Sequence, residues 1–365
     1  MVKVNDFCYI KVEFEGLKDF NFKMFDRFIL HEQAGLIIPI FELVLFQTDY
    51  SLYKTIIKTN LKMTISYGPS IDKVKKYKFV LLNYMYTQKD KGFDLSLTGI
   101  LDVKDFTNKI DISASEVNSN EILSSMKTII PVIDYKGDDK QVWIRHNCTE
   151  KDFAERIIKH AYIEEKDLVM SALTVNKEMI VKGYKKAIKD KEIIEFKEGK
   201  ENESADKIRM DGFQLESDSA IWSNFLSEGR KLPVVSAKDR KMEMLSPSQG
   251  SLKNSKLYQE QSDNVHHKAI LDNGNCHDNY YKAWLNNLNY FVQLIRNNVI
   301  INISKTFLDN NTVKLLDTVK FTPDNPNSQD FVDSISGKYI LTEKITEITQ
   351  KGFKHSVKLN RDYNL

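Results

Sequence analysis

YKFVLLNYMYTQKDKGFDLSLTGIL, residues 77–101, is the stretch of sequence that decides the fold. Residues that would share one face recur at every second position on both sides of a polar centre, Gln88 to Gly92. These positions are Tyr77, Phe79, Leu81 and Asn83 before the centre, and Phe93, Leu95, Leu97 and Gly99 after it. A period of two around a turn sequence predicts a β-hairpin with one buried face. Because a lone hairpin is only marginally stable, further strands must pair with it.

A second stretch of the same kind, Lys338–Leu359, lies near the other end of the chain and is expected to turn at Lys351-Gly352. The two turn regions, Thr87–Phe93 and Thr349–Phe353, share Thr-Gln at their start and Lys-Gly-Phe at their end. Both hairpins end near an aspartate, Asp102 and Asp362. A match this short also arises by chance, so internal duplication and coincidence both remain open.

The first 105 residues are predicted to be mainly β, as a small barrel or sandwich. Short runs rich in β-branched and aromatic residues alternate there with Gly, Asp, Asn and Ser. The runs are Val12 and Phe14, Ile37–Phe46, Leu61–Ser66, Tyr77–Tyr86 and Phe93–Leu101.

The middle of the chain has a mixed α/β pattern. A short helix is expected within Ser115–Met126, and Thr149 to Asp152 is typical of a helix start, with Phe153, Ile157, Ile158 and Ala161 on one helical face. The expected strands are Gln141–Ile144, Leu168–Thr174 and Lys177–Val181. Lys185–Ser204 is dense in Lys and Glu, which predicts a solvated connection.

Residues 205–282 have the weakest pattern, and long loops are expected there. Tyr280–Ile295 differs, because its large apolar side chains fall on one helical stripe, and we expect a packed helix. Strands are then expected at Val299–Ile303 and Val313–Phe321, before the second hairpin.

Composition limits the possible functions. At 365 residues the chain should form two or more domains, and 41% hydrophobic with 28% charged residues is an ordinary globular mixture. The formal net charge is +2. This is too close to zero to provide the broad basic surface of a dedicated nucleic-acid binder. Three widely spaced cysteines, Cys8, Cys148 and Cys276, form no disulfide pattern and suit a reducing compartment.

The sequence predicts a soluble protein without an export signal. The residues from Lys3 onward alternate like a strand and lack the apolar core of a signal peptide. The most apolar stretch, Leu36–Phe46, contains Pro39 and Glu42 and is shorter than the roughly 20 residues of a membrane-spanning helix.

No constellation with good spacing for catalysis, a cofactor or a metal is found, so we expect no catalytic, cofactor-binding or metal-binding residues. The best metal candidate is His266-His267 with Cys276-His277, but adjacent ligands rarely point at one ion, and polar loop residues explain them better. His146 and Cys148 could form a nucleophile pair, but no third group to orient the histidine is evident.

Other enzyme and nucleic-acid signatures are also weak. The 14 glycines form no phosphate-binding loop and no Gly-x-Ser-x-Gly elbow. Adjacent carboxylates such as Asp138-Asp139 and Glu164-Glu165 cannot face each other across a sugar ring, so solvated turns explain them better. Lys75-Lys76-Tyr77-Lys78 could meet a nucleic acid, but strand alternation alone places its lysines outside.

The order of these segments resembles the central hub proteins of tailed-phage baseplates and related contractile injection machines, the group that includes the late control protein D family. The resemblance spans most of the chain and rests on pattern. It is carried by the hairpin Tyr77–Leu101, Ser115–Met126, Gln141–Ile144 leading into Asp152-Phe153, His160–Ile163, Tyr280-Tyr281 with Trp284, and the stretch Gly337–Leu359.

The resemblance implies a mainly β, α+β fold with two tail-tube-like β-barrel domains and smaller α/β inserts. The expected divisions are a first barrel over 1–107, an α/β insert over 108–200, a loop-rich region over 201–279 that contributes to the second barrel, and a helix with the second barrel over 280–365. The interrupting segment Ser113–Lys182 is expected to face away from the tube.

The implied function is structural and not enzymatic. The hub would be a homotrimer in the virion tail that connects the six-fold tail tube to the three-fold spike and lines the channel for DNA ejection. Its expected partners are the tube protein, a spike or tip protein, baseplate wedge or sheath-side proteins, and DNA or tape measure protein in passage. It would be assembled in the host cytoplasm. The alternatives are a peptidoglycan-degrading tail enzyme using Cys148 or the His266–His277 region, and a tail-tube initiator or adaptor.

Overall fold

The protein is described by a computed structural model. The structure describes residues 2–5, 8–15, 24–48, 62–89, 92–165, 167–198, 206–217, 231–236, 238–246, 270–272, 276–311, 313–324 and 329–361. Strands dominate these residues, so the predicted mainly β class is confirmed. Short 3-10 helices lie at Ile71–Lys73 and Lys104–Thr107.

One continuous sheet of 14 strands forms the frame of the molecule. Its first half is antiparallel and contains both strands of the hairpin predicted at residues 77–101. In spatial order the strands of this half are β1 (Val2–Asn5), β2 (Cys8–Phe14), β5 (Lys62–Gly68), β6 (Lys75–Lys89), β7 (Gly92–Leu101), β4 (Ile40–Thr48) and β3 (Phe25–Gln33).

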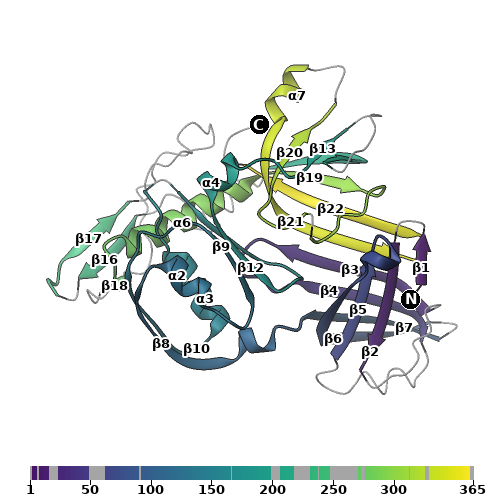
Figure 1. The fold of residues 1–365 in the computed structure, drawn as a ribbon, viewed down its shortest axis with the longest axis horizontal. Helices are drawn as coiled ribbons and strands as arrows, with labels where there is room; N and C mark the ends of the chain where they lie inside the picture. Colours follow the sequence, from purple (N-terminus) through teal and green to yellow (C-terminus); the bar gives the residue numbers. More distant parts are fainter. Residues whose placement is uncertain are drawn as a thin grey trace.

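The second half of the sheet begins where β21 (Gly337–Thr349) pairs with β3. On one side of β21 lie β22 (Gly352–Asn360), β19 (Asn297–Ile303) and β15 (Gly212–Ser217). On the other side, alongside the first part of β21, lie β20 (Thr318–Thr322), β13 (Glu195–Lys197) and β14 (Lys207–Arg209). Segments from the two ends of the chain thus lie side by side (Figure 1).

The two halves repeat one strand order. The chain order β3, β4, β5, β6, β7 gives the spatial order β3-β4-β7-β6-β5 in the first half. The chain order β15, β19, β20, β21, β22 gives β15-β19-β22-β21-β20 in the second. Every pairing within these two sets is antiparallel.

The two hairpins also match residue by residue. β6 and β7 are joined through Gly92 and β21 and β22 through Gly352, and both glycines have a positive φ, of 129° and 156°, which favours glycine. Each hairpin has one bulge, at Leu82 and at Thr342. Gly352 lies 260 residues after Gly92, and the bulge at Thr342 lies the same 260 residues after the bulge at Leu82.

The prediction of closed barrels is wrong. Among the strands that the structure describes, the order is an open path in which neither half pairs its last strand with its first. The bulge at Thr342 divides β21, so that residues 337–341 pair with β20 while residues 343–349 pair with β3. The edge of β21 at residues 343–349 pairs with β3 of the first half, so it is not available to close the second half.

An α/β insert lies to one side of this frame (Figure 1). It contains the helices α2 (Ser119–Ser124) and α3 (Glu150–His160). Its strands are β9 (Ile130–Asp134), β11 (Val169–Leu173) and β12 (Glu178–Gly183), which form one sheet, and β8 (Lys109–Val117) and β10 (Gln141–Thr149), which form another. The helix predicted within Ser115–Met126 exists only from Ser119, because β8 extends to Val117.

Helix α3 confirms the start expected at Thr149. The Asp152 N–H donates to Thr149 Oγ1 at 3.0 Å, and the Thr149 N–H donates to Asp152 Oδ2 at 3.4 Å, which satisfies helix-end donors from both sides. The predicted apolar face is buried, and α3 packs against α6 (Tyr280–Arg296), the packed helix expected at Tyr280–Ile295.

Two regions predicted to be loops contain regular elements. Lys185–Ser204 includes most of α4 (Tyr184–Lys189) and all of β13, because a few apolar residues among the lysines suffice for short elements. Residues 205–282 contain β14, β15 and a small sheet of β16 (Leu232–Ser236), β17 (Met242–Leu245) and β18 (Ile270–Asp272). The predicted strand Val313–Phe321 begins only at Thr318, and α7 (Gln329–Ile335) follows it.

The insert packs into the cores of both halves. Val169 and Leu173 belong to the core of the first half, whereas Leu168, Met170 and Ala172 belong to the core of the second. Alternate side chains of β11 point to opposite faces of its sheet, so this strand contributes to two cores at once. The insert therefore fixes the two halves relative to each other.

Candidate functional site

The junction of β3 with β21 is the place where the two halves of the sheet meet. The strands pair from Gln33 opposite Glu343 to Arg27 opposite Thr349. The His31 Nε2 atom lies 2.8 Å from Glu343 Oε1, so an ion pair crosses the junction when the histidine is protonated.

Two buried ionisable residues lie in the junction, next to the pair of Gln33 with Glu343. Glu32 and Lys344 stand opposite each other, with 4% and 2% of their surfaces exposed. The Lys344 Nζ donates to the Leu308 carbonyl at 3.2 Å and to Asn310 Oδ1 at 2.5 Å. The Glu32 carboxylate accepts the Val175 N–H at 2.8 Å.

Burial shifts the pKa values of Glu32 and Lys344 in the directions that favour their neutral forms, because a surrounding of low polarity penalises a charge. Loss of solvation raises the pKa of Glu32, and the nearby Lys344 opposes this rise. Loss of solvation also lowers the pKa of Lys344, which Glu32 opposes in turn. Each charge therefore depends on the other for its stability.

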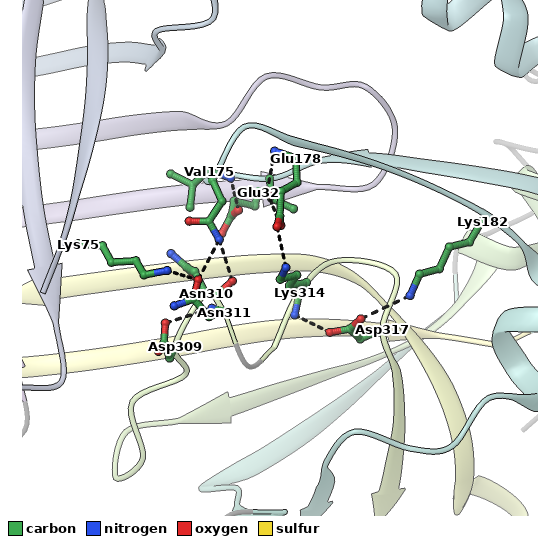
Figure 2. A network of polar contacts seen from close by, with 12 residues as sticks. Glu32, Lys75, Val175, Glu178, Lys182, Asp309, Asn310, Asn311, Lys314 and Asp317 are labelled. Atoms are coloured by element: carbon green, nitrogen blue, oxygen red, sulfur yellow. Dashed lines mark hydrogen bonds and ion pairs between the residues drawn. The ribbon is translucent and has the colours of Figure 1, made fainter. Parts of the chain in front are cut away.

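The segment 305–317 between β19 and β20 connects this pair to the insert (Figure 2). Lys314 Nζ lies 2.8 Å from Glu178 Oε1, and Lys182 Nζ lies 3.5 Å from Asp317 Oδ1. The Asn176 side chain donates to the Asn310 carbonyl at 3.1 Å. Charged groups of the insert thus bind a segment of the second half.

The same segment contacts the first half. Asn310 Nδ2 donates to the Tyr67 hydroxyl at 2.7 Å and to the Tyr77 hydroxyl at 3.3 Å. Beneath it the Leu308 N–H donates to His355 Nε2 at 3.1 Å, so His355 is held neutral with its proton on Nδ1, 3.1 Å from Thr346 Oγ1. Burial lowers the pKa of His355 well below its usual value. The junction is a polar clamp joining both halves and the insert, and its buried groups are engaged with one another.

The residues considered for nucleophilic chemistry do not form a site. His146 is exposed and Cys148 half-buried, and the bulged pairing of β10 with β8 between Arg145 and Cys148 breaks the strand alternation between them. Arg145 points inward there and pairs with Glu150 at 3.2 Å. The register supports the ordinary interpretation of a strand end.

Only part of the candidate metal site, Cys276 and His277, belongs to the residues that the structure describes. His266 and His267 lie outside the described residues. The His277 Nε2 donates to the His160 carbonyl at 3.1 Å, and the His160 Nδ1 donates to the Tyr280 carbonyl at 3.1 Å. Burial lowers the pKa of His160 to about 4. Within the described ranges no group of three or more His, Cys, Asp or Glu could hold a metal ion.

The other candidates have structural contacts. Asp139 is buried and accepts the Ser119 and Tyr162 N–H groups, both at 2.8 Å, which ties α2 to the segment after α3. Glu164 and Glu165 pair separately with Lys185 and Lys282. The solvated-turn interpretation is therefore correct for these glutamates and wrong for Asp139.

Strand alternation places two of the three lysines around Tyr77 outside, as predicted, whereas Lys75 lies on the same face as Tyr77 and is half-buried. Tyr77 is buried, whereas Lys76 and Lys78 on either side are exposed. Lys75 contacts Asn311.

An apolar pocket of about 280 Å³ lies between α3, α6 and β11. Its lining includes Leu36, Ile158, Met170 and Trp284. Its one carboxylate, Glu155, is paired with Lys151. In the helices that the structure describes, no segment is long and apolar enough to cross a membrane.

Sequence reasoning missed β3 and β15, the strands that end the repeated sets. Asp26, Arg27 and Glu32 interrupt the apolar pattern of β3. The available signals were the short alternations Phe28-x-Leu30 and Phe213-x-Leu215.

Comparisons with known proteins connect this arrangement to a known fold. No protein-family model and no curated protein matches the chain. Among solved structures, a tail protein from Neisseria meningitidis MC58 is similar with a TM-score of 0.60 at 8% identity, covering 97% of each chain. The 43 kDa tail protein of prophage MuSo2 from Shewanella oneidensis is similar with a TM-score of 0.60 at 11% identity, covering 97% of this chain and 98% of that one. The chain therefore has the fold of these two tail proteins over nearly its whole length.

Proposed function

We propose that this chain is a structural component of a phage-type tail, and specifically the central hub that joins the tail tube to the spike. The observation that carries the proposal is the repeated strand order, β3-β4-β7-β6-β5 in one half and β15-β19-β22-β21-β20 in the other. The likeness in fold to two tail proteins, over 97% of the chain, supports the same assignment.

The repeated strand order would allow three chains to match the six-fold symmetry of a tail tube. A six-fold tube can be continued by three chains only if each chain offers two similar surfaces. The matching bulges at Leu82 and Thr342 support two related tube-like domains in one chain, and therefore a homotrimer. The polar clamp at the junction of β3 with β21 would hold the two domains at a fixed angle, as a rigid ring requires.

The remaining parts of the proposal follow from this position. The hub would contact the tube protein on one side and a spike or tip protein on the other, with baseplate wedge or sheath-side proteins around it. DNA or tape measure protein would pass through its channel. The α/β insert lies to one side of the sheet, beside the junction of its two halves, and would face away from the tube (Figure 1). The protein would be assembled in the host cytoplasm and located in the baseplate of the virion.

We also propose that the chain has no catalytic activity of its own. The buried Glu32 and Lys344 are each bonded to backbone groups, the Val175 N–H and the Leu308 carbonyl, and His146 and Cys148 lie around a bulged strand end. A tail-associated wall-degrading enzyme would instead require a nucleophile, a metal or a pair of facing carboxylates beside an open cleft.

Labelling of assembled tails tests the location. Antibody against the chain, detected with gold by electron microscopy, should mark the spike end of tails purified from the producing culture. Label along the whole tube would indicate a tube protein, and tails without label would contradict the proposal.

A further inference from the structure

The second part of β6 and the second part of β21 are counterparts with different neighbours. Residues 343–349 of β21 pair with β3 on one side and β22 on the other. β5 pairs with β6 only up to Val80. Beyond Val80, β7 alone pairs with β6 among the strands that the structure describes.

Exposure follows this difference. Thr342 and Ile348 of β21 are 5% and 0% exposed. Their counterparts 260 positions earlier are Leu82, which is 63% exposed, and the exposed Gln88. Met85 in the same part of β6 is 62% exposed. An apolar strand edge of this kind promotes pairing with another chain.

The strands at the other end of the repeated sets, β3 and β15, also differ in whether their outer edge is covered. β3 and β15 are counterparts, because β4 and β19 pair with them in the same register, which matches Phe28 with Phe213 and Leu30 with Leu215. Phe28 and Leu30 are fully buried, and β21 covers their edge. Phe213 and Leu215 are only partly buried, and β19 is the one described strand that pairs with β15.

We infer that the second part of β6 in one copy pairs antiparallel with β15 of the next copy, as β21 pairs with β3 inside the chain. The occupant of each edge is therefore a second copy of this chain. The edges differ from each other, so the contact is head-to-tail, and a rotation that closes gives a ring. The inference rests on the proposed function only for the ring size of three.

The internal junction also fixes the register. β21 pairs Ile345 with His31 and Ile348 with Phe28. Transferred to the counterparts, Met85 of one copy lies opposite Glu216 of the next, and Gln88 opposite Phe213. This register places no two like charges opposite each other, so it carries none of the repulsion that opposes strand pairing.

Disulfide formation between copies tests the register. Directly opposite residues bring their Cβ atoms to about 4.5–5.5 Å, whereas diagonal neighbours are about 7–8 Å apart, too far for a disulfide. The in-register pairs are Met85→Cys with Glu216→Cys and Gln88→Cys with Phe213→Cys, and they sample both kinds of position in the ladder. Met85→Cys with Gln214→Cys, two residues out of register, is the matched control.

Each single variant is purified separately, mixed with its partner variant and oxidised. The parent chain, which keeps buried Cys8 and half-buried Cys148 and Cys276, serves as the blank. At least one in-register pair should give about tenfold more covalent dimer than the control pair. If the purified chain is monomeric by light scattering, the same oxidation is carried out on assembled tails that contain the variants.

The outcomes separate the inference from the proposed function. A chain carrying both Met85→Cys and Glu216→Cys should give covalent dimers and trimers and nothing larger. A ladder beyond trimers would retain the edge pairing and contradict the trimeric hub. Equal linking of the control pair, or assembled chains without any link, would overturn the inference.

Discussion

Glu32 and Lys344 are cross-strand neighbours at the only place where the first half of the described sheet is paired with the second, and both are almost fully buried. They come from opposite ends of the chain. Because a buried charge is costly without its partners, this pair favours one relative placement of the two halves.

Replacing Lys344 by Met should strongly destabilise the protein. The substitution keeps an aliphatic side chain but removes the donor to Leu308 and Asn310, and it leaves Glu32 without a cation. Leaving buried acceptors without their donor costs about 1–3 kcal/mol, and more where a charged group loses its compensation. The loss should appear as a lower urea midpoint at pH 7.

The matched control for this prediction is Lys11→Met, which removes a surface ion pair with Glu13 whose side chains are 42% exposed. It should cost less than about 1 kcal/mol. The double variant Glu32→Gln with Lys344→Met should lose less than the sum of the single variants. Additive losses would show that the two charges are not coupled.

The need to keep the buried His355 ring neutral should lower the free energy of unfolding in acid. Its pKa is lowered well below the usual 6.5 in the folded state, so below about pH 6.5 the unfolded chain binds more protons than the folded one. Stability from this group is therefore lost as the pH falls. His355→Gln should flatten the stability curve between pH 7 and pH 5, measured by urea unfolding at each pH.

His160 provides an independent comparison, because its pKa of about 4 predicts a loss in the same direction between pH 6.5 and pH 4. His160→Gln should also flatten the curve. Curves for both variants that run parallel to the parent curve would refute the assignment of neutral buried histidines.

Gly99 of β7 should not tolerate a side chain. A Cβ there would overlap the Val80 carbonyl oxygen and the ring of Phe41. Overpacking of this kind costs about 1–3 kcal/mol, so Gly99→Ala should lower the thermal midpoint. Gly212→Ala is the matched strand control, since its Cβ would meet nothing within 4 Å and stability should change by less than about 0.5 kcal/mol. Equal effects would contradict the described packing of β4 against β7.

Removal of the candidate nucleophile pair should leave function intact. The double variant His146→Ala with Cys148→Ala alters an exposed and a half-buried side chain at the end of β10. Tail assembly and cell-wall turbidity clearance should both equal those of the parent. Loss of clearance in a variant with an unchanged circular dichroism spectrum would support the enzyme alternative.

The sequence predicted the elements whose local pattern agrees with their final environment. The hairpin of β6 and β7 alternates around a turn, and α3 has both a capping box at Thr149 and an apolar face. These signals depend only on neighbours along the chain, so no tertiary information was needed.

The sequence could not predict how the halves join. β3 contains buried Glu32, whose burial is possible only because Lys344 and Val175 arrive from distant segments. The sequence comparison aligned the Lys-Gly-Phe part of the two hairpins as the pairing does, but its Thr-Gln part was displaced by two residues, because Lys89 and not Thr87 corresponds to Thr349. Strand pairing therefore supports the repeat far better than residue identity.

The copy number of the chain at the spike end of assembled tails tests the central claim most directly. Cryo-electron microscopy of purified tails should show three copies in one ring, with the two halves of each copy related by about 60° around the tail axis. A single copy, or six copies that each contribute one half to the ring, would contradict the account.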